Sequence, residues 1–219
     1  MMYLRTAGDM LHLTAIFILL GKMLRQRSAA GLSLKTQFLF ALVFTTRYVD
    51  LLTTFLSVYN TLMKIFFLAT SWHICYLMRF KSPWKATYDH ENDTFRIRYL
   101  IIPAAVLALI FTGDQHGLWV LDVLWTFSQY LEAVAILPQI FLLEYTERYE
   151  ALTSHYLAAM GAYRFFYLLH WIAGLLYYGR INTISVCAGV LQTVLYVDFF
   201  YHYVSQVVWR AKQRYDLAR

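Results

Sequence analysis

Three arginines stand inside apolar stretches of this sequence. Arg47 lies in the run 40–52 with Asp50 three residues later, a spacing that would put both on one face of a helix. Arg5 and Arg164 lie in two other apolar stretches. The planar guanidinium binds carboxylates through paired, charge-assisted hydrogen bonds. The three arginines therefore predict a ligand that carries several carboxylates.

Further polar and aromatic side chains recur at helical spacing in the same stretches. The predicted stripes are Arg5, Asp9 and His12; Arg47, Asp50 and Thr54; Asp122, Trp125, Gln129 and Glu132; and Tyr163, Arg164, Tyr167, His170 and Trp171. Asp50 and Asp122 could take a cationic part of the ligand, and the two tryptophans could pack against it. We predict that the ligand resembles a short acidic peptide with a free C-terminus. The alternative is a set of structural ion pairs between helices.

Four titratable residues in the apolar stretches stand out: His12, Glu132, Lys64 and Asp198. Histidine is the side chain type that titrates between mildly acidic and neutral pH. Glu132 occupies the position equivalent to His12 in the second half of the chain, so the two could form a proton-linked pair. The alternative is a neutral histidine hydrogen-bonded in the bundle. Lys64 is expected to extend to the membrane surface. Asp198 lies in the last apolar stretch.

The elements that position these side chains are predicted to be transmembrane helices. The 219 residues are 60% hydrophobic with a mean hydropathy of +0.48, and only 15% are charged, against roughly a quarter in a soluble domain. The apolar blocks are about 20 residues long, as a bilayer requires. The seven predicted spans are 3–22, 36–54, 60–79, 97–113, 119–143, 153–173 and 181–207.

The first three spans resemble the last three. Residues 4–16 share Leu, Thr, Leu, Ala and Ile in register with 124–136, and Arg47 matches Arg164 at nearly the same offset. An odd linker span makes the two triplets parallel, as in SWEET-type transporters. We therefore predict a single all-α membrane domain. Its repeats cover about 3–79 and 119–207, its linker helix about 97–113, and its tail 208–219.

The basic residues predict the orientation. Fourteen of the 19 Lys and Arg residues fall in the segments after the first, third, fifth and seventh spans, whereas the opposite loops hold only Arg180. The positive-inside rule puts the N-terminus in the lumen and the C-terminus in the cytosol. The sequon at Asn92 should then stay unglycosylated. The same distribution argues against nucleic acid as the partner of this basic chain.

The sequence predicts no enzyme and no cofactor. Cys75 and Cys187 lie singly in apolar blocks and lack metal or redox spacing. The chain contains no nucleophile elbow and no phosphate-binding glycine loop.

Several longer strings carry a family resemblance. They are LFALVFTTRY at 39–48, KATYD at 85–89, DTFR at 93–96, LWTFS at 124–128, VAILPQ at 134–139 and DFFY at 198–201. On these strings the chain resembles the KDEL receptors, which retrieve luminal proteins of the endoplasmic reticulum, over essentially its whole length. The resemblance implies a seven-helix fold related to SWEET and PQ-loop transporters.

The resemblance also implies a function. Such a receptor binds KDEL- or HDEL-like C-terminal signals in the acidic Golgi lumen, returns the cargo with the COPI coat, and releases it at neutral pH. It resides in the membranes of the endoplasmic reticulum and cis-Golgi, with COPII for forward transport. Its implied signal-binding residues are Arg5, Arg47, Tyr48, Asp50, Thr54, Asp122, Trp125, Arg164, Tyr167, His170 and Trp171. The implied pH-sensing residues are His12, Glu132 and Tyr163, and those for retrograde transport are Asp198, Arg210 and Lys212.

The chain departs from the family pattern at several positions. Gly174 replaces an arginine and Asn182 an aspartate, while His170 replaces an asparagine and Asp122 a glutamate. We therefore predict a preference for a variant signal without a basic first residue. The tail holds Lys212 among arginines instead of a lysine cluster.

Two other classes of protein would fit seven helices. A small-solute transporter shares the fold, but a neutral solute does not need three arginines. A G-protein-coupled receptor has the helix count, but the repeat and the short loops argue against it.

Overall fold

The fold is described from a computed structural model, which covers residues 2–113, 117–146, 151–179 and 182–217. Over these residues the secondary structure is helical, with no strand. The helices are α1 (Met2–Gln26), α2 (Leu34–Arg47), the 3₁₀ helix η1 (Val49–Leu52), α3 (Val58–Phe80), α4 (Trp84–Thr87), α5 (Arg98–Ile110), α6 (Trp119–Val134), α7 (Leu137–Thr146), α8 (Ala151–Tyr178) and α9 (Thr183–Leu217).

Several of these helices are long and apolar enough to cross a membrane. Within the described ranges they are Tyr3–Gln26, Val58–Phe80 and Thr183–Tyr201, together with Trp119–Thr146 when α6 and α7 are taken as one span. The helix α5 is apolar but shorter. This composition and these lengths are those of a helical membrane protein.

The predicted helix 36–54 is wrong at its C-terminal end. The helix α2 ends at Arg47 and the chain continues into η1, so Asp50 does not share a helix face with Arg47. The hydroxyls of Thr45 and Thr46 donate back to backbone carbonyls within the last turns, at 2.7 and 3.0 Å. Such bonds compete with regular helix geometry and favour a bend or an end.

The predicted span 119–143 is also interrupted. The helix α6 ends at Val134, and α7 begins at Leu137. Pro138 is the second residue of α7, a position in the first turn where its missing N–H costs no helical hydrogen bond. The proline thus starts a new helix after a break instead of kinking a continuous one.

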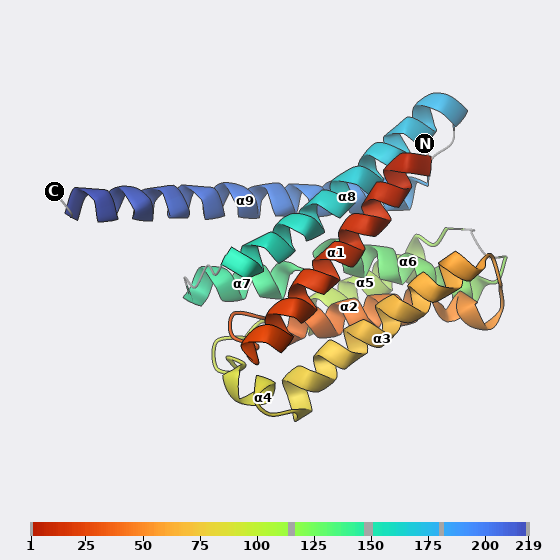
Figure 1. Cartoon of the computed structure of the whole chain (residues 1–219). Helices are drawn as coiled ribbons and strands as arrows, with labels where there is room; N and C mark the ends of the chain where they lie inside the picture. Colours follow the sequence, from red (N-terminus) through yellow and green to blue (C-terminus); the bar gives the residue numbers. More distant parts are fainter. Residues whose placement is uncertain (1, 114–116, 147–150, 180–181, 218–219) are drawn as a thin grey trace.

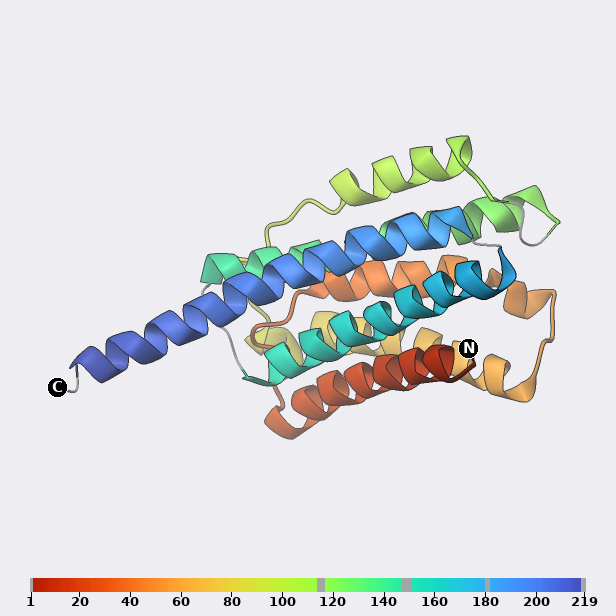
Figure 2. The same ribbon diagram turned by 90° about the horizontal axis from the view of Figure 1, so that it is seen from above.

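The helices form one bundle. The most extensive contact joins α1 to α8, and α2 packs between α3 and α6. The helix α5 packs on α6, while α9 packs on both α6 and α8. The N-terminus, η1 and the end of α8 lie at one end of the bundle, and α4 lies at the other, where α9 projects beyond it (Figures 1 and 2).

A buried junction closes the end of the bundle near α4. The Gln139 amide donates to the Gly31 carbonyl and accepts from the Ser33 N–H, both at 2.9 Å. The Gln139 N–H donates to the Thr36 hydroxyl at 2.9 Å. The Ser33 hydroxyl in turn donates to Asp93 at 3.1 Å. This Gln139 junction joins α2, α7 and the loop after α4.

Candidate ligand-binding cavity

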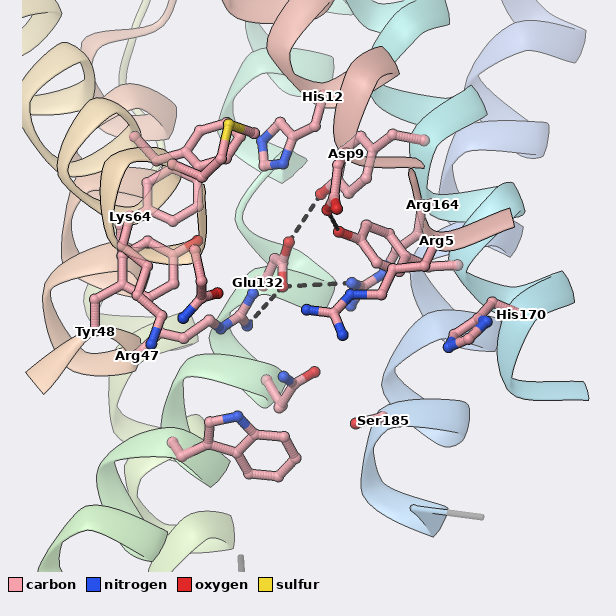
Figure 3. Close-up of a pocket in the computed structure, with 18 of the residues that line it drawn as sticks. Arg5, Asp9, His12, Arg47, Tyr48, Lys64, Glu132, Arg164, His170 and Ser185 are labelled. Carbon is pink, nitrogen blue, oxygen red and sulfur yellow. Dashed lines mark hydrogen bonds and ion pairs between the residues drawn. The ribbon is translucent and has the colours of Figure 1, made fainter. Parts of the chain in front are cut away.

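A cavity of about 390 Å³ lies between the helices (Figure 3). Residues near the starts of α1 and α3 line it, so it lies toward the end of the bundle that holds the N-terminus. Its volume falls in the usual range for small-ligand sites, about 300–1,000 Å³. The lining residues come from α1, α2, η1, α3, α6, α8 and α9, together with the turn before α3. They are Arg5, Asp9, His12, Phe44, Arg47, Tyr48, Asp50, Leu56, Tyr59, Asn60, Met63, Lys64, Phe67, Trp125, Gln129, Glu132, Tyr163, Arg164, Tyr167, His170, Trp171 and Ser185.

The lining carries a net positive charge. Four side chains are cationic (Arg5, Arg47, Lys64 and Arg164), against three carboxylates. The cavity therefore favours an anion. It also contains two histidines, His12 and His170.

Glu132 lies at the centre of this charge arrangement. Its Oε2 is 2.6 Å from Arg47 Nη2 and 3.4 Å from Arg164 Nη1. Its Oε1 accepts a hydrogen bond of 2.8 Å from the Tyr163 hydroxyl. Arg47 Nε also donates to the Ser128 hydroxyl at 3.0 Å. One carboxylate thus serves two arginines (Figure 3).

The Arg164 guanidinium has spare donors. Its Nε and Nη2 are buried and have no hydrogen-bond partner among the described residues. Its Cζ lies 5.4 Å from the centre of the Trp171 ring, which supports the cation from one face. Buried donors are almost always satisfied in native proteins. The two open N–H groups therefore mark a position where a ligand oxygen would complete the site.

His12 is buried in a stack of aromatic rings. Its ring lies 4.1 Å from Tyr163 at an interplanar angle of 6°, and 4.6 Å from Phe67. Only 7% of the residue is exposed. Tyr163 contacts His12 with its ring and Glu132 with its hydroxyl. It therefore links the histidine to the carboxylate that holds Arg47 and Arg164.

Lys64 corrects a prediction from the sequence. It does not extend to the membrane surface but lies buried in the cavity wall, 9% exposed. Its Nζ is 2.6 Å from Asp50 Oδ2. The helix break after Arg47 turns Asp50 toward α3, where it meets Lys64. An ion pair outweighs snorkelling here because Asp50 offers a partner in the protein interior.

Asp9 has a partner on the neighbouring helix. The Tyr167 hydroxyl donates a short hydrogen bond to Asp9 Oδ1. Gly8 permits this close approach, since a Cβ there would lie 3.2 Å from the Tyr167 ring. Tyr167 stacks in turn on Trp171, with ring centres 5.9 Å apart. The contact between α1 and α8 thus fixes one wall of the cavity.

The structure brings most of the predicted site residues together. In the lining are Arg5, His12, Arg47, Tyr48, Asp50, Trp125, Glu132, Tyr163, Arg164, Tyr167, His170 and Trp171. Thr54 is exposed, Asp122 is buried, and neither lines the cavity. Asp198 is exposed on α9, also away from the cavity. The side chains of Arg210 and Lys212 lie outside the described part of the chain.

Sequence reasoning missed part of the lining. The sequence predicts a position at the membrane surface for Lys64 and no role in a site for Tyr59, Asn60 and Ser185. An ionisable residue inside an apolar helix is itself a functional signal, so Lys64 could have been found. The other three lie near helix ends, where polar residues are common.

Over the described residues, a helical bundle with several apolar helices and a buried, positively charged cavity is the structure of a polytopic membrane protein with an internal polar cavity. The family model described as ER lumen protein retaining receptor matches residues 28–174. The chain belongs to this family of receptors, which is not a family of enzymes.

Similar proteins cover nearly the whole chain. The chain is 52% identical to the ER lumen protein-retaining receptor of Drosophila melanogaster, over 93% of this chain and 94% of the relative. It is 51% identical to ER lumen protein-retaining receptor 2 of Gallus gallus and 50% identical to that of Homo sapiens, with the same coverage.

Proposed function

We propose that this chain is a retrieval receptor for escaped luminal proteins of the endoplasmic reticulum. It binds their KDEL-like C-terminal signal in the acidic Golgi and releases it at neutral pH. The observation that carries this proposal is the pair of arginines that share Glu132, with two Arg164 donors still open. Because the two arginines share one carboxylate, one positive charge and the open Arg164 donors can bind a second carboxylate, that of the ligand.

Arg47 is the proposed anchor for the terminal carboxylate of the signal. Glu132 and Ser128 occupy it in the ligand-free cavity, so an incoming carboxylate competes with Glu132 for the guanidinium. Arg164 would bind the same group or the neighbouring one through its open donors. Arg5 points into the cavity (Figure 3) and would take an acidic side chain of the signal.

His12 is the proposed proton sensor. Protonation would add a positive charge to the aromatic stack beside Tyr163 and strengthen the attraction for the anionic signal. By linkage, a ligand that binds the protonated form more tightly takes up a proton when it binds. Binding should therefore strengthen as pH falls.

The His12→Ala variant should lose most of this pH dependence while it still binds the signal. Titration of a labelled tetrapeptide between about pH 5.5 and about pH 7.2 would measure the effect. The control is His73→Ala, an exposed residue of α3 outside the cavity. An unchanged pH response in His12→Ala would remove His12 from the mechanism.

The proposed signal lacks a basic first residue. The charge of Asp50 is matched by Lys64, and Asp9 accepts from Tyr167. The space around Gly174, where the family has an arginine, is open. Asn182 accepts from the Ser185 N–H at 3.0 Å and so caps α9, a role that asparagine and aspartate fill equally well. A comparison of KDEL, HDEL and neutral-first-residue peptides would test this, and a KDEL preference would contradict it.

We also propose that the bundle consists of two parallel repeats of three spans. The contact of α1 with α8 has a counterpart in that of α6 with α2, and α2 with α3 has one in α8 with α9. These pairs support two parallel repeats of three spans joined by α5. The proposed C-terminus is cytosolic, where Asp198, Arg210 and Lys212 would serve retrograde transport with COPI, with COPII for the return to the cis-Golgi.

The first test is binding of a labelled acidic tetrapeptide to the purified receptor at about pH 5.5 and about pH 7.2. Its C-terminal amide is the matched control ligand. Tight binding in acid only, lost on amidation, is the expected result. Absence of binding by every signal variant at both pH values would favour the small-solute transporter instead.

A further inference from the structure

A second hollow lies on the outside of the bundle, between α2 and α3. This α2–α3 groove has a volume of about 580 Å³ and shares no lining residue with the charged cavity. Aromatic side chains form much of its wall: Phe38 from α2, and Trp72, Tyr76 and Phe80 from α3. Trp72, Tyr76 and Phe80 are exposed by 43%, 48% and 69%. A membrane protein presents such a wall to lipid chains.

The groove is cationic at one end. Lys35 lies in the first turn of α2 and Arg79 in the last turn of α3, so both stand at the α4 end of the bundle (Figure 1). An adjoining hollow shares Lys35 and adds Arg96 and Arg98. Among the described residues, neither Lys35 nor Arg79 forms an ion pair with a carboxylate. The groove thus combines an aromatic wall with a cluster of positive charge.

The nearest buried carboxylate has other partners. Asp93 accepts from the hydroxyls of Ser33 and Tyr88, and from the Lys35 backbone N–H at 3.4 Å. Burial and the hydrogen bond to Asp93 raise the pKa of Tyr88, so the Tyr88 hydroxyl stays protonated and donates to Asp93. The Lys35 ammonium group, in the first turn of α2, is also destabilising there because the N-terminal end of the helix dipole is positive. Asp93 therefore bonds the backbone N–H of Lys35, which leaves the Lys35 ammonium group for the groove that it lines.

We propose that the α2–α3 groove binds an anionic phospholipid of the leaflet at the α4 end of the bundle. The acyl chains lie along Phe38, Trp72 and Tyr76, and the phosphate contacts Lys35 and Arg79. Basic pockets between transmembrane helices are a known form of headgroup recognition. The Trp72 indole is fixed in the wall of the groove, because its Nε1 donates a hydrogen bond of 3.0 Å to the Thr45 hydroxyl. This site is independent of signal binding in the charged cavity.

Quenching of Trp72 fluorescence by lipids with brominated chains tests the proposal. The purified receptor is titrated in detergent micelles with brominated phosphatidylserine or brominated phosphatidylcholine. The Trp72 signal is the difference between the wild type and Trp72→Phe. We expect phosphatidylserine to quench Trp72 at a severalfold lower mole fraction than phosphatidylcholine. Equal quenching by the two lipids would overturn the proposal.

Charge variants locate the headgroup. The double variant Lys35→Gln/Arg79→Gln should lose the preference for phosphatidylserine, whereas the control Arg25→Gln/Lys85→Gln, made at exposed residues outside the groove, should keep it. A preference that survives in Lys35→Gln/Arg79→Gln would refute the assignment. Circular dichroism checks the fold of each variant. Soluble glycerophosphoserine, which has no chains, should not displace the lipid, and displacement would show an adventitious anion site instead.

Discussion

At the scale of single residues, Glu132 determines whether the cavity is stable without a ligand. It is 1% exposed and lies within 3.4 Å of both Arg47 and Arg164. Two arginines buried beside each other would repel without this carboxylate. In the proposed binding mode the pairing also opposes binding, because a ligand carboxylate must displace Glu132 or share its arginines.

We predict that Glu132→Gln lowers stability and strengthens the response to ligand. Loss of one partner of a buried ion pair typically costs about 3–5 kcal/mol, so the melting temperature should fall. The acidic tetrapeptide should raise the melting temperature more in this variant than in the wild type, since no carboxylate competes for Arg47. Thermal unfolding with and without peptide measures both effects.

The control for this prediction is Glu144→Gln, at an exposed position of α7. It should unfold at the wild-type temperature and respond to peptide as the wild type does. A wild-type melting temperature for Glu132→Gln would show that the two arginines do not depend on this carboxylate. A peptide response no larger than that of the wild type would argue against competition at Arg47.

At the scale of helices, close packing fixes the aromatic wall of the cavity. A Cβ at Gly189 would lie 2.6 Å from Trp171 Cζ3, so α9 holds the indole through the absence of a side chain. Trp171 in turn supports the Arg164 guanidinium. The position of the Arg164 guanidinium on α8 thus depends on Gly189 of α9.

We predict that Gly189→Ala weakens peptide binding without unfolding the bundle. The added methyl group must push the Trp171 ring aside, and Arg164 then loses its support. We expect the affinity for the acidic tetrapeptide to fall by about tenfold, which corresponds to about 1.4 kcal/mol. Gly21→Ala is the matched control, because its Cβ meets nothing within 4 Å. Equal affinity in the two variants would disprove this role of Gly189.

We also predict that the Gln139 junction stabilises the end of the bundle near α4. Gln139→Ala removes the side-chain bonds to Gly31 and Ser33 and leaves one buried and one partly buried backbone group unsatisfied. Each such group costs about 1–3 kcal/mol, so the variant should unfold at a clearly lower temperature. Gln26→Ala, at an exposed end of α1, should not. An unshifted melting temperature for Gln139→Ala would mean that the junction does not hold this end together.

The sequence predicted the existence of the helices more accurately than the positions of their breaks. Hydropathy located each α-helix that lines the cavity, but not η1, because burial in a bilayer constrains composition over whole turns. The breaks after Arg47 and Val134 depend on local competition between threonine hydroxyls, a proline and the helix ladder, which spacing does not reveal. The Lys64–Asp50 pair follows from the first of these breaks, so sequence reasoning missed it too.

At the scale of the whole molecule, the two ends of the bundle differ in a way that fits one orientation. The charged cavity lies toward the end that holds the N-terminus, and the Gln139 junction closes the opposite end. Nine of the 19 Lys and Arg residues lie at or near the closed end, in the segments 22–35 and 79–98. A receptor for luminal signals needs its cavity open to the lumen, which is the orientation that the positive-inside rule predicts.

Glycosylation mapping would test this orientation. A sequon carried on an extension at the N-terminus should be glycosylated in microsomes, and the same extension at the C-terminus should not. Asn92 is a natural internal control, since its sequon lies at the closed end beside Asp89, to which its amide donates at 2.8 Å. It should stay bare in the intact protein. A glycan on Asn92 or on the C-terminal extension would invert the topology and place the charged cavity on the cytosolic side, where no luminal signal could reach it.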